Sequence, residues 1–159
     1  MHCWCPPMTE VRARAGSYAA ATASLADIAQ PFAALYQSFW SLDSIPAQTL
    51  EVCRLRLAQL LASDVAWQYE QCALPPEKRE QLKLWPGSPH FSPAEKACLE
   101  FTEVHAMDAR AITDAQADAI KQHYGEVGLV ALLQALGVFD AVIRLGLIWD
   151  LQSQELATS

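Results

Sequence analysis

Two helix-start signals in the second half of the chain constrain its fold more than any other feature. In Ser92-Pro93-Ala94-Glu95, serine stands at the cap, proline at the first helical position and glutamate at the third. Thr113-Asp114-Ala115-Gln116 repeats this capping box for a helix that we expect to stop at Gly125. No stretch shows the sustained alternation of a strand bounded by hairpin turns. The sequence therefore predicts an all-α fold, a bundle of six or seven helices.

Further helices are expected on both sides of these signals. Ser24 can cap a helix that runs to about Trp40, and Pro31 would kink that helix or delay its start. Another helix follows Ser44-Ile45-Pro46, and residues 127–151 are apolar nearly all round, as in a central or interface helix. We expect residues 24–159 to form a single domain. The Ala-rich segment 1–23 shows little pattern and is expected to be flexible or extended.

Composition and charge exclude several classes of function. Hydrophobic residues make up 52% of the 159 and charged residues only 18%, so apolar surface must be hidden in a core, in a subunit interface, or in both. The net charge of −7 and the scattered basic residues argue against a nucleic-acid partner. The apolar run 127–139 is shorter than the roughly 20 residues that span a bilayer, so no membrane partner is expected. Five cysteines without disulfide-like spacing favour reduced thiols and a cytoplasmic location.

The segment 51–70 resembles the signature of the carboxymuconolactone decarboxylase and alkylhydroperoxidase D-like (AhpD-like) superfamily. That signature runs close to E-x-x-R-x-R-x-A-x-x-N-G and then C-x-x-C-x-x-x-H. Its first half is matched by Glu51, Arg54, Arg56 and Ala58. In its second half Ser63 and Ala66 replace the two cysteines, and Glu70 replaces the histidine.

The resemblance extends beyond the signature and implies an architecture. Segment 91–103 is similar to the helix that follows the signature in peroxidase-related members, and segment 138–144 is similar to a late N-x-x-N-R segment, with Arg144 kept. The family is all-helical and assembles as trimers or hexamers, so the resemblance implies an AhpD-like bundle and a homo-oligomer. The family activity is peroxide reduction by a dithiol. A serine hydroxyl has a far higher pKa than a thiol and forms no disulfide, so no thiol peroxidase activity is expected at Ser63.

The candidate site consists of the residues that stand at the family's reactive positions. Ser63, Ala66 and Glu70 are spaced i, i+3, i+7, which at roughly 100° per residue predicts that they share one helical face. If Glu51 and Glu70 face a common cleft, they form an acid–base pair, and a cation there is a weaker alternative. In the other interpretation Ser63 is a cap or packing residue, Glu70 is solvated, and Glu51 pairs with Arg54 or Arg56. Substrate contacts are expected from Asp64, Ala66, Trp67 and His105.

The other reactive side chains have structural explanations. Cys53 and Cys98 lie on apolar helix stripes, where a free cysteine behaves as a small hydrophobe. Cys3-Trp4-Cys5 is an isolated C-x-C in the first segment. Asp140 and Arg144 are spaced i, i+4 on an apolar helix, which favours an ion pair that fixes packing or a subunit contact, with catalysis as the alternative.

These observations lead to three functional hypotheses. The first is a degenerate AhpD-like protein that has lost the dithiol and retains non-redox acid–base chemistry through Glu51, Ser63 and Glu70. The second is a non-catalytic protein that binds a small ligand or serves assembly. The third is a lactone decarboxylase. None of them calls for a metal or an organic cofactor.

Overall fold

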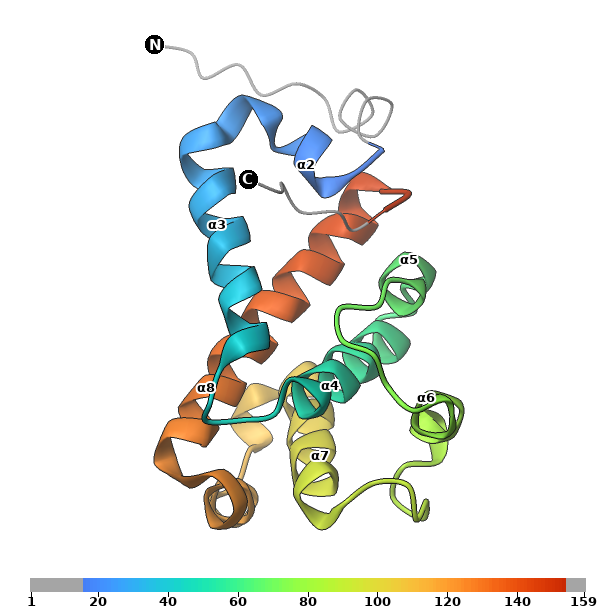
Figure 1. The fold of residues 1–159 in the computed structure, drawn as a ribbon, viewed down its shortest axis with the longest axis vertical. Helices are drawn as coiled ribbons and strands as arrows, with labels where there is room; N and C mark the ends of the chain where they lie inside the picture. The colour runs from blue at the N-terminus through green and yellow to red at the C-terminus, as the bar shows by residue number, and fades with distance from the viewer. Residues whose placement is uncertain (1–15, 154–159) are drawn as a thin grey trace.

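The computed structural model describes residues 16–153, and within them it contains seven α-helices and no β-strand. The expected all-α bundle of six or seven helices is confirmed. Short 3-10 turns follow or precede several helices, and Figure 1 shows the arrangement of the α-helices. The helices are α2 (Tyr18–Ala21), α3 (Ala26–Ser38), α4 (Ala47–Leu60), α5 (Asp64–Gln68), α6 (Pro76–Gln81), α7 (Pro93–Met107) and α8 (Asp114–Trp149). The 3-10 turns are η1 (Ala23–Leu25), η2 (Phe39–Ser41), η3 (Leu82–Leu84) and η4 (Ala109–Ala111).

Both predicted capping boxes start their helices as expected. Ser92 Oγ accepts a hydrogen bond from the Glu95 N–H at 3.2 Å, and the Glu95 carboxylate accepts one from the Ser92 N–H at 2.9 Å. The same exchange joins Thr113 and Gln116 at 3.3 and 3.0 Å. Each box satisfies N–H groups that have no partner within the first turn of a helix.

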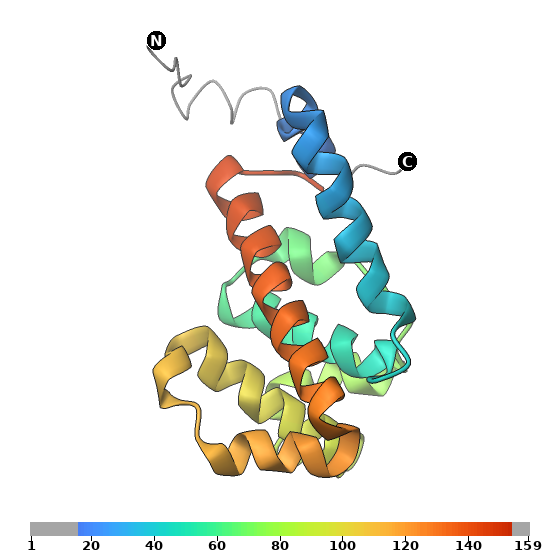
Figure 2. The same ribbon diagram turned by 90° about the vertical axis from the view of Figure 1, so that its left-hand side faces the viewer.

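The predicted stop at Gly125 is a break inside α8. Gly125 has φ 69° and ψ −178°, a backbone conformation that residues with a Cβ rarely adopt. The helix resumes at once on the other side of Gly125, so α8 consists of two helical segments joined at an angle (Figure 2).

The helical structure begins before the boundary that we expected at residue 24. Tyr18, in α2, stacks on Phe32 with ring centroids 5.9 Å apart and packs against Trp149 at 5.6 Å. The Gly16 carbonyl also accepts hydrogen bonds from the backbone N–H groups of residues 152 and 153. Ser24 lies within η1 and does not cap α3, and Pro31 stays inside α3. Residues 1–15, with Cys3 and Cys5, lie outside the described residues.

The core forms where α4, α7 and the second segment of α8 meet. Nine of the fourteen residues of α4 are buried, which makes it the central helix of this part of the molecule. Cys53 of α4 and Cys98 of α7 are fully buried there, as expected. Helix α3 crosses α8 (Figures 1 and 2). Trp40, in the η2 turn that follows α3, stacks on Phe139 of α8 with ring centroids 5.2 Å apart.

Helix α8 also has the length and hydropathy of a membrane-spanning helix, which no other helix in residues 16–153 has. Buried side chains make up 39% of its most apolar 18-residue window. The core helix of a soluble protein passes the same test of length and composition.

Candidate functional site

The turn between α4 and α5 holds the first residues of the candidate site. After α4 ends, Ala62 takes a left-handed conformation with φ 52°, and the chain reverses. Ser63 is the N-cap of α5: its Oγ accepts a hydrogen bond from the Ala66 N–H at 3.3 Å. Ser63 is only 5% exposed. The capping interpretation of Ser63 is therefore the one that the structure supports.

Ser63, Ala66 and Glu70 do not share one helical face, so that prediction is wrong. Helix α5 ends at Gln68, and Tyr69 has extended φ and ψ values of −79° and 122°. Glu70 lies beyond this end at the surface, where its carboxylate accepts a hydrogen bond from the Leu74 N–H at 3.2 Å. A spacing of i, i+7 aligns side chains only while the helix continues.

Glu51 is held in a buried ion pair with Arg54. Arg54 Nε and Nη2 donate to the two Glu51 carboxylate oxygens at 2.8 and 2.7 Å, and both side chains are at most 1% exposed. Arg54 Nη1 also donates to the Ala66 carbonyl at 2.8 Å, and Nη2 donates to that of Tyr69. The Gln71 N–H donates to Glu51 at 3.2 Å. The pair thus joins α4 to the segment 66–71, and Glu51 has no free carboxylate to offer to an acid–base partner.

Arg56, two residues after Arg54 on α4, is also held by structural contacts. Its Nε donates to the Glu103 carboxylate of α7 at 2.7 Å, and the Trp85 indole N–H donates to the same oxygen at 2.7 Å. Arg56 Nη1 donates to Gln59 Oε1 at 2.8 Å. These bonds connect α4, α7 and the turn after η3, and they fix the Gln59 amide.

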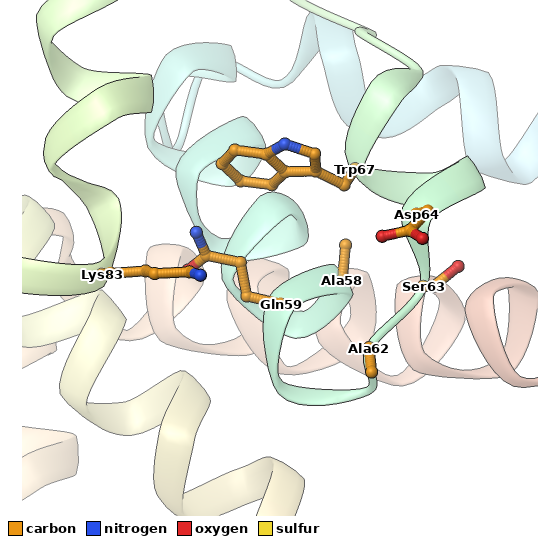
Figure 3. A pocket seen from close by; sticks show the side chains of 7 residues that line it. All are labelled: Ala58, Gln59, Ala62, Ser63, Asp64, Trp67 and Lys83. Atoms are coloured by element: carbon orange, nitrogen blue, oxygen red, sulfur yellow. The ribbon is translucent and has the colours of Figure 1, made fainter.

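A pocket of about 370 Å³ opens beside the α4–α5 turn (Figure 3). Of the predicted site residues, Ser63, Asp64 and Trp67 line it. Glu51, Glu70 and His105 do not, and neither does Ala66, which is fully buried. The complete lining consists of Ala58, Gln59, Ala62, Ser63, Asp64, Trp67 and Lys83.

The two ends of this pocket differ in charge. Figure 3 shows Lys83 and the Gln59 amide at one end and the Asp64 carboxylate at the other, with the Trp67 indole as a wall between them. The Ser63 hydroxyl lies on the far side of the turn from Lys83. The guanidinium of Arg79 lies 4.6 Å from the centre of the Trp67 ring and donates to the Trp67 carbonyl, which fixes the indole.

The sequence predicted three of the residues that line this pocket, Ser63, Asp64 and Trp67. It did not indicate the other two polar ones, Lys83 and Gln59. Lys83 belongs to η3, on a charged segment with no motif of its own. Gln59 belongs to the last turn of α4 and to no recognisable motif. Nothing in the spacing of these residues indicates that they meet, because the turns between α5 and η3 bring them together.

A second pocket of about 230 Å³ lies beside the same turn. Ser63 and Asp64 line both pockets. The second one is completed by the last turn of α8 and the residues after it. Its full lining consists of Ala62, Ser63, Asp64, Val65, Gly146, Leu147, Asp150 and Leu151.

No cysteine lines either pocket. A hydrogen bond with Cys53 and burial raise the pKa of the Cys98 thiol far above its ordinary value. The pKa of Cys72 is raised by partial burial and by the carboxylates of Glu51 and Glu70. The three cysteines among residues 16–153 are free thiols, and the thiolate form that reacts with peroxide is disfavoured for Cys72 and Cys98.

Within residues 16–153, His105 and the acidic residues provide no group that could hold a metal ion. His105 is half-buried near the end of α7, and its Nδ1 has no hydrogen-bond partner within the described part of the chain. Residues 16–153 contain no group of three His, Cys, Asp or Glu side chains that could hold an ion.

Comparison with known proteins identifies the fold. No protein-family profile matches the sequence, and no curated protein matches it. One similar solved structure is a protein of unknown function from Agrobacterium tumefaciens, described as a candidate AhpD antioxidant defence protein. The two superpose with a TM-score of 0.73 at 15% sequence identity, over 87% of this chain and 96% of the other. The chain therefore has an AhpD-like fold.

Proposed function

We propose that this AhpD-like chain binds a small planar acid in the pocket beside Trp67, and that it performs no thiol redox chemistry there. Of the three hypotheses, the geometry favours the ligand-binding protein. The observation that carries the proposal is the pairing of Lys83 and Gln59 at one end of a pocket whose wall is an indole ring.

The cationic end suits a carboxylate. Lys83 forms no ion pair with any residue of the described range, so its ammonium group is available to a ligand. Gln59 Oε1 already accepts from Arg56, which leaves the amide N–H groups of Gln59 as donors. Two donors at one end, one of them charged, match the two oxygens of a carboxylate.

The rest of the pocket suits a flat body with a donor at its far end. Ala58, Ala62 and the Trp67 ring provide apolar contacts, and the Asp64 carboxylate can accept a hydrogen bond from a hydroxyl or amino group. A volume of about 370 Å³ lies within the range of about 300–1,000 Å³ that is usual for small-molecule sites. A hydroxylated or aminated aromatic acid fits this arrangement of groups.

The chemistry of the lining argues against peroxide reduction. Peroxide reduction by a dithiol needs a thiolate and a second thiol within reach, and the lining offers the Ser63 hydroxyl and the alanines 58 and 62. Acid–base chemistry through Glu51 and Glu70 is disfavoured as well, because Arg54 holds Glu51 inside the core and Glu70 lies at the surface. Asp64 is the one carboxylate that lines the pocket.

Calorimetric titration with 4-hydroxybenzoate, benzoate and benzyl alcohol tests the proposal. We expect the two acids to bind and the alcohol, which lacks the carboxylate, to bind at least about tenfold more weakly. Lys83→Met should weaken binding of the acids by about tenfold or more, because a charged hydrogen bond is lost. Lys121→Met, at a surface ion pair on α8, is the matched control and should bind as the wild type does.

Two outcomes would contradict the proposal. One is the absence of acid binding by the wild type, and the other is equal binding by the wild type and Lys83→Met. A carboxylated lactone, incubated with the protein and followed by chromatography, separates binding from turnover. Its consumption in the wild type and not in Asp64→Asn would favour the lactone decarboxylase hypothesis instead.

A further inference from the structure

The Gln59 side-chain amide has one end that accepts hydrogen bonds and one end that donates them, and Arg56 fixes which end faces the pocket. Gln59 Oε1 accepts a hydrogen bond from Arg56 Nη1 at 2.8 Å. A guanidinium has five N–H donors and no acceptor, so turning the amide over would set donor against donor. The oxygen therefore stays with Arg56, and the amide N–H groups remain for the pocket that Gln59 lines.

Arg56 is itself held by Glu103 of α7. Arg56 Nε donates to Glu103 Oε1 at 2.7 Å, and the two side chains are only 16% and 27% exposed, so water competes little for this bond. The bonds to Glu103 and to Gln59 leave from different nitrogens of one planar guanidinium, so fixing the first also directs the second. Glu103 thus orients the Gln59 amide through Arg56, although it does not line the pocket.

The same oxygen of Glu103 also anchors the turn that carries Lys83. The Trp85 indole N–H donates to Glu103 Oε1 at 2.7 Å. Leu82 and Trp85, on either side of Lys83, are buried, so the η3 turn is held against the core while the Lys83 side chain lines the pocket. Figure 3 shows Lys83 and Gln59 at the same end of the pocket. One carboxylate oxygen therefore helps to position both donors at that end.

An end that offers donors alone discriminates between two ligands of nearly the same shape. A carboxylate presents two acceptor oxygens, one for the Lys83 ammonium and one for an N–H of Gln59. A primary amide presents one oxygen and one NH2 group, and the NH2 group then meets a donor of the pocket. A polar group left unpaired in this way lowers the affinity of the amide.

We propose that Arg56, held by Glu103, is a positioning residue that makes this pocket select an ionised carboxylate over the primary amide of the same acid. The inference rests on the proposed function, because it concerns the acid-binding end of the same pocket. It adds a second source of selection to the charge of Lys83. Arg56 does not line the pocket and acts by keeping the Gln59 oxygen away from the ligand.

Calorimetric titration of the full chain with benzoate and with benzamide tests the inference. The wild type should bind benzoate at least about tenfold more tightly than benzamide. In Arg56→Met the Gln59 amide can turn over, and its oxygen can then accept from the NH2 group of benzamide. Benzamide should therefore bind this variant more tightly than the wild type, by about threefold or more, while benzoate binds it more weakly. A general loosening of the pocket would weaken both ligands.

Two further variants complete the experiment. Arg56→Lys keeps the positive charge, but a single ammonium replaces the planar fork that binds Glu103 and Gln59 together, so both affinities should shift in the same directions. Arg144→Met removes an arginine from the Asp140 ion pair on α8 and is the matched control, which should bind both ligands as the wild type does. Circular dichroism should show that each variant is folded.

Benzamide binding that is equal or weaker in folded Arg56→Met than in the wild type would overturn the inference. Should Arg56→Met not fold, the same comparison with Arg56→Lys decides. If benzoate binding depends on Lys83 while neither Arg56 variant gains affinity for benzamide, this inference fails and the proposed function stands. A wild type that binds no benzoate would refute both.

Discussion

The Arg54 guanidinium donates two hydrogen bonds, of 2.8 and 2.7 Å, to the Glu51 carboxylate, and both side chains are buried in the core. Because Arg54 also binds the carbonyls of Ala66 and Tyr69, this pair determines where α5 begins and ends relative to α4. The two residues therefore fix the turn between α4 and α5, beside which the pocket lies.

Loss of the Glu51 carboxylate should destabilise the fold strongly. Glu51→Gln leaves the Arg54 charge buried without a counter-ion, and breaking such a pair costs about 3–5 kcal/mol. Urea denaturation followed by circular dichroism measures this as a lower unfolding midpoint. Lys121→Met removes one partner of a surface ion pair and should leave the midpoint near that of the wild type. Equal midpoints for Glu51→Gln and the wild type would show that the pair is dispensable.

Peroxide reduction should not depend on Ser63. With dithiothreitol as reductant, the wild type and Ser63→Ala should consume cumene hydroperoxide at the same background rate, because a hydroxyl is not oxidised by a peroxide. Ser63→Cys/Ala66→Cys provides the comparison, since it restores a C-x-x-C at the start of α5, where the N–H groups of the helix favour a thiolate. Turnover by the wild type that disappears in Ser63→Ala would refute the expectation.

The parts of the fold that the sequence predicted are those with local causes. Each capping box and the break at Gly125 depend on residues within one turn, so short patterns reveal them. The end of α5 has no such signal, because neither glycine nor proline follows Gln68 for several residues. Arg54 from α4 and Arg79 from α6 bind the last carbonyls of α5, and these contacts exist only in the folded chain.

The candidate site shows the same division between local and distant causes. Trp67 and Asp64 belong to the signature segment and could be expected at the site. Lys83 reaches the pocket from η3, and no pattern in the sequence connects it with Gln59. The prediction for Glu70 was wrong because it required the helix to continue to residue 70, whereas α5 ends at Gln68. Long-range packing determined each of these outcomes.

Cys72 should alkylate more slowly at pH 8 than an ordinary cysteine. Partial burial and the negative charges of Glu51 and Glu70 raise the pKa of its thiol, so less of it is the reactive thiolate at that pH. Glu70→Gln removes one of the charges and should increase the rate, on the order of twofold because Glu70 is exposed and screened by water. Iodoacetamide labelling with mass mapping of the Cys72 peptide measures both rates. Glu77→Gln serves as the control, and a slower rate in Glu70→Gln would contradict the electrostatic account.

Two glycines of α8 should respond in opposite directions to the same substitution. Gly125 has φ 69° and ψ −178°, where an added Cβ strains the backbone, so Gly125→Ala should destabilise the protein by about 1–3 kcal/mol. Gly137 has helical geometry and open space around it, so Gly137→Ala should stabilise the protein by about 0.5–1 kcal/mol. Urea unfolding followed by circular dichroism measures both changes. If Gly125→Ala left the stability unchanged, α8 could run through residue 125 as a regular helix, and the break there would not be required by the fold.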